Sequence, residues 1–126
     1  MKALAPHWRR PAADVAWVGE GWRHLVEECH RKVSARFPDY ELLNIKQKYG
    51  VLAFLASPRP WSRGTSTWTD EALELEQIIR EYTRRSESTC EYCGAAGELR
   101  DSRTMHLTLC DRCEARFSDP PRPGQD

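Results

Sequence analysis

Four of the five cysteines in this 126-residue chain are concentrated in one short segment, and their spacing constrains the fold more than any other feature. They form two C-x-x-C pairs, Cys90 with Cys93 and Cys110 with Cys113, and sixteen residues separate the pairs. A C-x-x-C loop bends the backbone so that two sulfurs point at one ion, and two such loops complete a tetrahedron. The sequence therefore predicts a single Zn²⁺ held by four thiolates.

Four protein ligands fill the coordination shell of zinc and leave no position for water or substrate. We therefore expect a structural site and not a catalytic one. Structural zinc sites contribute of order 10 kcal/mol to folding. A contribution of that size suits a segment that is too short to bury a hydrophobic core of its own.

The residues around the cysteines predict a treble-clef or ribbon-like zinc finger over residues 87–118. Gly94 directly follows the first pair, where a tight knuckle often needs positive φ. Residues 97–109 can form a small hairpin, and residues 111–117 have helical character. Three apolar residues would alternate onto one side of the hairpin: Met105, Leu107 and Leu109. The order of knuckle, hairpin, knuckle and helix favours the treble clef.

Residues 21–86 predict a helix, a β-hairpin and a second helix. Apolar residues at steps of three or four indicate the first helix: Trp22, Leu25, Val26, Cys29, Val33 and Phe37. Residues 40–57 read as two short strands that meet at Tyr49 and Gly50. The second helix has its own apolar stripe: Ala72, Leu75, Ile79 and Tyr82. The predicted fold class is α+β, with a small helix–hairpin–helix body and a C-terminal zinc finger.

The two ends of the chain show no such pattern. Residues 1–20 lack apolar periodicity and are interpreted as an N-terminal arm, and residues 119–126 as a disordered tail. No run of eighteen apolar residues exists, and the first residues lack the apolar stretch of a secretory signal. We therefore expect no membrane partner and a cytoplasmic protein, because reduced thiols in the cytoplasm more often bind metal than form disulfides.

Net charge is zero, but its distribution is uneven. Residues 1–60 carry ten Lys or Arg against six Asp or Glu, a balance of +4, whereas residues 61–126 carry nine against thirteen, a balance of −4. A nucleic-acid reader usually presents a concentrated basic face. Here the cysteine module lies in the acidic half, which weighs against nucleic acid as the first hypothesis.

Four basic residues form the candidate anion contact. Lys46 and Lys48 lie on one face of the first predicted strand, and Arg59 and Arg63 lie in the loop that follows the hairpin. The opposite strand face would carry Leu43, Ile45 and Gln47. The alternative is a solvated strand face whose lysines keep an exposed edge from aggregating, and we favour this alternative.

Two tryptophans, Trp61 and Trp68, bracket the same loop. They would serve either as packing anchors or as an exposed contact patch. Packing is the simpler interpretation, although five tryptophans are more than a core of this size requires.

A treble-clef nuclease would need a general-base histidine in the hairpin and a histidine or asparagine on the helix for a catalytic metal. The hairpin offers Asp101 and His106, but the helix offers only Asp111, Glu114 and Arg116. We therefore do not expect an enzyme.

Four segments, in the order GWRHLVEECH, NIKQKYGVLAF, SESTCEYCGAAGELR and LTLCDRC, resemble a set of small bacterial and phage-borne proteins of uncharacterised function. Their pattern is roughly I-K-x-K-(F/Y)-G-x-L-R-(F/Y), then C-E-x-C-G and a final T-L-C. The resemblance covers about residues 20–113 and implies a shared fold and a mobile-element or accessory setting, without an activity. Where the pattern has arginine this chain has Ala53, which would weaken an anion site formed with Lys46 and Lys48.

The sequence thus predicts a non-enzymatic accessory or adaptor protein. In this hypothesis, structural zinc stiffens a surface made by the finger's hairpin and the Trp61–Trp68 loop, and a protein partner binds there. The alternative is a nucleic-acid-binding accessory protein, for DNA more than RNA, that uses the four basic residues of the hairpin and loop together with Arg9 and Arg10 of the arm. A nuclease-like enzyme is third.

Overall fold

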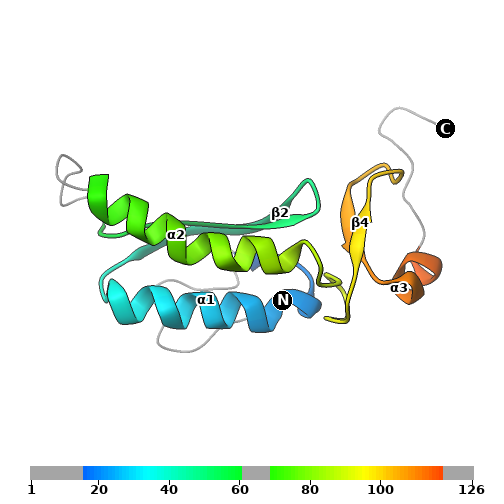
Figure 1. The fold of residues 1–126 in the computed structure, drawn as a ribbon, viewed down its shortest axis with the longest axis horizontal. Coiled ribbons are helices and arrows are strands. Elements are labelled where there is room, and N and C mark those ends of the chain that lie inside the picture. Colours follow the sequence, from blue (N-terminus) through cyan, green and yellow to red (C-terminus); the bar gives the residue numbers. More distant parts are fainter. Residues whose placement is uncertain (1–15, 61–68, 118–126) are drawn as a thin grey trace.

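The computed structural model describes residues 16–60 and 69–117, which form a helix-and-sheet body with a smaller cysteine-containing unit at one end (Figure 1). We call residues 87–117 the finger and the described residues before them the body. The elements in chain order are β1 (Ala16–Trp17), the 3₁₀ helix η2 (Glu20–Trp22), α1 (Arg23–Arg36), β2 (Glu41–Lys48), β3 (Val51–Ser57), α2 (Thr69–Ser86), β4 (Glu98–Arg100), β5 (Leu107–Leu109) and α3 (Asp111–Arg116). The predicted α+β fold class is confirmed.

The body has two layers, in which α1 and α2 lie side by side over one face of a three-stranded sheet (Figure 1). The strand order is β1-β2-β3, with β1 parallel and β3 antiparallel to β2. All six residues of the stripe predicted for the first helix are buried in this core. On α2, Leu75 and Tyr82 are buried as predicted, but Ala72 is exposed because it lies on the side of the helix that faces solvent.

The predicted hairpin is confirmed, and its two-residue turn has both residues at positive φ, Tyr49 at 54° and Gly50 at 86°. This conformation matches the right-handed twist of the strands, and glycine adopts it without steric cost. The Gln47 side chain closes the turn, because its Oε1 accepts the Gly50 N–H at 2.8 Å.

The prediction that Leu43 shares the face of Ile45 is wrong. The β2–β3 register shifts between Leu42 and Asn44, so that one extra residue interrupts the alternation of β2. As a result Leu42 is buried together with Ile45, while Leu43 is half-buried.

The body includes residues 16–18, which were predicted to belong to the N-terminal arm. Ala16 and Trp17 pair with β2 as a parallel strand, and Val18 is part of the core. Residues 1–15, 61–68 and 118–126, which include most of the predicted arm and the predicted tail, lie outside the described residues. No helix in the described part of the chain combines the length and apolar character needed to cross a bilayer.

Candidate metal centre

The four finger cysteines converge on one point, as their spacing predicts. Their sulfur atoms all lie within 4.8 Å of one another, and the Sγ atoms of Cys93 and Cys110 are 3.6 Å apart. A tetrahedral zinc with Zn–S bonds of about 2.3 Å places its sulfurs about 3.8 Å apart. Within residues 16–60 and 69–117, the one cluster of possible metal ligands consists of Cys90, Cys93, Cys110 and Cys113. The donor set and its spacing therefore suit a single tetrahedral ion.

Local backbone structure positions each pair. After the first pair, the chain turns at Gly94 (φ 85°), whose N–H donates to the Cys90 carbonyl at 2.9 Å. The second pair begins α3, because Cys110 is the N-cap and its sulfur accepts the Cys113 N–H at 3.4 Å. Between the pairs, β4 and β5 form the predicted antiparallel hairpin.

The environment of Cys90 favours its thiolate. Burial raises the pKa of this thiol, but backbone N–H groups of Cys110, Cys93 and Tyr92 hydrogen-bond to it and together lower the pKa to about 7. A metal ligand must be deprotonated, so this knuckle is already arranged for the charged form.

Two arginines of the finger hairpin hold α3 in place, and sequence reasoning did not single them out. Arg100 donates to the Leu109 carbonyl at 3.0 Å and to the Asp111 carboxylate at 2.8 Å. Arg103 is buried and donates to the Glu114 carboxylate at 2.8 Å and to the carbonyl of Phe117 at 2.9 Å. Acidic residues just after a cysteine pair would have been the sequence signal for such partners.

The first knuckle docks directly on η2 of the body. The Gly21 N–H donates to the Glu91 carbonyl at 2.7 Å, and the Trp22 indole N–H donates to the Thr89 carbonyl at 2.8 Å. A Cβ at Gly21 would lie 2.2 Å from the Cys90 carbonyl oxygen, so only glycine fits there. The finger is therefore packed against the body and not merely appended to it.

A second junction joins β5 to the turn of the body hairpin. The Thr108 hydroxyl donates to the Gly50 carbonyl at 2.6 Å, and Leu99 lies against Gly50. Thr108 is fully buried for this reason, although the predicted alternation buried only its neighbours. Met105 precedes β5 and is 52% exposed, so its predicted place on the apolar stripe is wrong.

The candidate anion contacts do not form one cluster. Lys46 and Lys48 lie on β2, and neither forms an ion pair with another described residue. Arg59 follows β3 at the opposite end of the hairpin, where its guanidinium pairs with the Glu71 carboxylate at 2.9 Å. Arg63 lies outside the described residues.

Trp61 and Trp68 also lie outside the described residues. The end of β3 and the start of α2, which precede and follow this loop in the sequence, lie at the end of the body farthest from the finger (Figure 1). The 18-residue α2 separates the two ends, a length of about 27 Å at 1.5 Å per residue. The structure thus does not bring the ends of this loop to the finger's hairpin.

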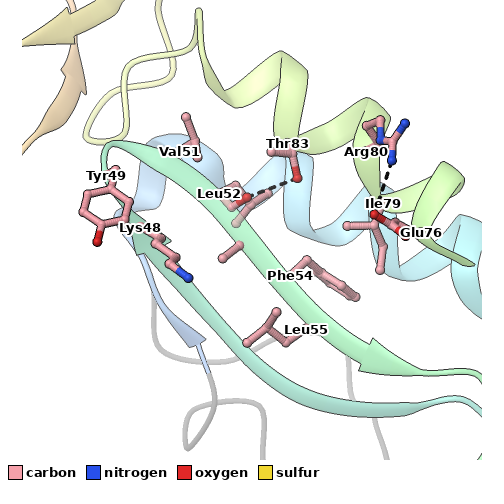
Figure 2. A pocket seen from close by; sticks show the side chains of 11 residues that line it. Lys48, Tyr49, Val51, Leu52, Phe54, Leu55, Glu76, Ile79, Arg80 and Thr83 are labelled. Atoms are coloured by element: carbon pink, nitrogen blue, oxygen red, sulfur yellow. Dashed lines mark hydrogen bonds and ion pairs between the residues drawn. The ribbon is translucent and has the colours of Figure 1, made fainter. Parts of the chain in front are cut away.

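A groove of about 430 Å³ runs between β3 and α2 near the hairpin turn. Figure 2 shows Tyr49 and Lys48 at its turn end, with Leu55 and Ile79 along its apolar walls. On the edge of β3, side chains of α2 satisfy both backbone groups of Leu52. Its N–H donates to the Ser86 hydroxyl at 2.9 Å, and its carbonyl accepts a hydrogen bond from the Thr83 hydroxyl at 3.2 Å. Sequence reasoning missed this groove, because its residues come from separate elements.

No protein-family model, curated protein or solved structure matches this chain. The geometry of the cysteine centre and of the surfaces around it therefore carries the functional argument.

Proposed function

We propose that the protein is a non-enzymatic, zinc-binding adaptor in which a treble-clef finger stabilises a surface for a protein partner. The convergence of four thiol groups supports a closed zinc site, since four sulfurs leave zinc no open position. We further propose a cytoplasmic setting, where these thiols would remain reduced and free to bind metal.

The observation that carries the adaptor hypothesis is a set of exposed apolar side chains that extends from the junction of body and finger along β3. We define the tip surface as Tyr49, Leu55 and Leu99, which are 73%, 43% and 46% exposed. The first two line the groove, and Leu99 lies against the adjoining Gly50. Exposed apolar patches mark interaction sites, and tyrosine is enriched among the residues that dominate binding energy. Because the finger holds the turn through Thr108, zinc would fix the shape of this surface.

The conformation of Tyr49 adds to this argument. It is the one non-glycine residue with positive φ among the described residues. Tyrosine in this region costs about 1 kcal/mol, whereas asparagine is a preferred residue at this turn position. An exposed aromatic residue with a strained backbone is better explained by binding than by folding.

The acidic residues of the finger support the absence of catalysis. The Asp111 and Glu114 carboxylates are occupied by Arg100 and Arg103. His106 is exposed in the segment before β5. A general base needs an orienting partner and a nearby substrate site, and the finger hairpin offers His106 neither.

The adaptor hypothesis is tested by affinity capture with the zinc-loaded full chain and the variant Tyr49→Asn. This change removes the aromatic ring but retains or improves the turn, so loss of a partner cannot reflect unfolding. Leu73→Gln is the matched control, because Leu73 is 55% exposed on α2 and does not line the groove. A partner held by wild type and Leu73→Gln but lost by Tyr49→Asn supports the proposal. A partner held equally by Tyr49→Asn contradicts it.

A nucleic-acid-binding function is the second candidate, favoured by Lys46 and Lys48 of β2, which form no ion pair with another residue of the described part of the chain. It is tested by fluorescence anisotropy with duplex DNA and single-stranded RNA at about 50 and 200 mM salt. A nucleic-acid binder would lose affinity steeply at the higher salt, and Lys46→Ala with Lys48→Ala would reduce that dependence. Absence of binding at both salts removes this candidate.

A further inference from the structure

The four cysteines of the centre differ in their access to solvent. Cys93 is exposed and Cys110 is half-buried, whereas Cys90 and Cys113 are buried beneath them. The two accessible sulfurs belong to different knuckles and lie 3.6 Å apart. The two less buried cysteines of the centre therefore have neighbouring sulfurs.

We infer that Cys93 and Cys110 form an oxidation site, at which a peroxide converts the pair to a disulfide and thereby releases zinc from the finger. This inference rests on the zinc binding proposed above, but not on the identity of any partner. It assigns a covalent modification to two residues whose first role is to hold the metal.

The chemistry balances with hydrogen peroxide as the oxidant. The Cys93 thiolate attacks one peroxide oxygen, the O–O bond breaks, hydroxide leaves, and Cys93 becomes a sulfenic acid. The Cys110 thiolate then attacks the Cys93 sulfur, the S–O bond breaks, and a second hydroxide leaves as the S–S bond forms. Two thiolates lose two electrons in total, one peroxide gains them, and two protons from solvent convert both hydroxides to water.

Access and distance select this pair. Oxidation by peroxide requires access to the sulfur, and Cys93 is the exposed cysteine of the centre. The backbone of Cys90 is covered by Gly21 and its sulfur is buried. A disulfide needs sulfurs about 2.05 Å apart, so Cys93 and Cys110 must approach from 3.6 Å.

The product leaves only Cys90 and Cys113 as thiolate ligands, and two ligands do not complete a zinc shell. The new bond joins the two knuckles at the place where the metal had joined them. It encloses β4 and β5 in the loop, so the hairpin stays closed after the metal has left. Oxidation would thus exchange one crosslink of the finger for another, with zinc as the released product.

Peptide mapping tests the site directly, because trypsin separates the relevant cysteines. Cleavage after arginine yields residues 86–100 with Cys90 and Cys93, residues 104–112 with Cys110, and residues 113–116 with Cys113. The zinc-loaded chain is treated with one equivalent of hydrogen peroxide, alkylated and digested without reductant. We expect 86–100 linked to 104–112, with fragmentation that assigns the bond to Cys93. A link within 86–100, a link to 113–116, or retention of all free thiols overturns the inference.

Zinc release provides the second readout, measured with a chromogenic chelator during the same treatment. Cys93→His keeps a zinc ligand at this position but cannot form the disulfide, so we expect its release rate to fall at least about tenfold. Cys29→Ser is the control and should release zinc as wild type does, because Cys29 is buried in the body core. Equal release by Cys93→His contradicts the inference. If Cys93→His binds no zinc, the peptide map of the wild type decides alone.

The two proposals fail separately. Absence of zinc from the purified protein contradicts the closed zinc site before any peroxide is added. A zinc-loaded protein that shows no Cys93–Cys110 link contradicts only the oxidation site.

Discussion

The body and the finger are stabilised in different ways. The body buries a core of fourteen residues from both helices and the sheet, whereas the core of the finger consists of Cys90, Leu107, Leu109 and Cys113. Burying a leucine contributes about 1.5–3 kcal/mol, while ordering each backbone residue costs about 1–2 kcal/mol. Two leucines cannot order a segment as long as residues 87–117. From this comparison we expect the finger to depend on a bound metal and on its docking to the body, and the body to fold without the metal.

Loss of a zinc ligand should have the largest effect and should be confined to the finger. Cys113→Ser leaves three sulfurs and removes most of a contribution of order 10 kcal/mol. We expect zinc affinity, measured by competition with a chelator, to fall by more than the roughly 10- to 100-fold caused by changing residues that only hydrogen-bond to a metal ligand. Circular dichroism should show that α1 and α2 persist. Wild-type zinc affinity in Cys113→Ser would contradict the four-ligand site.

Truncation of a body core residue should lower the stability of the protein without changing its zinc affinity. Leu25→Ala removes a fully buried side chain of α1 and should reduce the free energy of unfolding by about 2–5 kcal/mol. Because Leu25 is part of the body core and not of the finger core, the zinc affinity of the folded protein should remain that of wild type. Denaturant unfolding and chelator competition on the same sample separate the two readouts.

A substitution at the junction of body and finger should have an intermediate effect on both the free energy of unfolding and the zinc affinity. Gly21→Ala places a methyl group 2.2 Å from the Cys90 carbonyl oxygen, and the backbone must shift to admit it. We expect a loss of about 1–3 kcal/mol in unfolding free energy, accompanied by weaker zinc binding.

Glu20→Ala is the matched control for this junction. Its carboxylate forms an exposed ion pair with Arg23, and exposed pairs contribute little, so its loss should leave the free energy of unfolding close to that of wild type. Equal stability of Gly21→Ala and Glu20→Ala would show that the knuckle does not pack on η2.

The smallest expected effect concerns the contact between β5 and the body turn. Thr108→Val keeps the shape of the side chain but removes the hydroxyl that donates to Gly50, a hydrogen bond of 2.6 Å. We expect a destabilisation of about 1 kcal/mol, measured by denaturant unfolding. Thr108→Ser should restore most of it because serine retains the hydroxyl. Failure of serine to do so would assign the effect to packing.

Local patterns predicted much of this structure. The apolar stripe of α1, the hairpin turn at Tyr49 and Gly50, and the cysteine knuckles each depend on residues close together in the sequence. Such features follow from helical periodicity, turn preferences and ligand spacing.

What the sequence did not reveal depends on contacts between distant residues. Gly21 and Glu91 are separated by most of the chain, and a glycine that packs against a backbone leaves no periodic signal. The register shift near Leu43 arises from pairing with β3, which a single strand cannot show. Thr108 is buried only because the body turn lies beside it. In each case, a contact between elements that are distant in the sequence determined the structure, and local sequence patterns do not report such contacts.

Hydrogen–deuterium exchange of the full chain, with zinc bound and after chelation, tests the difference between the two regions most directly. We predict that chelation removes protection from finger amides, including Cys90 N–H, which donates to Ala95, and Glu91 N–H, which donates to Thr108. Amides of α1 and β2 should keep their protection. Finger amides that remain protected without zinc would contradict the account, as would simultaneous loss of protection in α1 and β2.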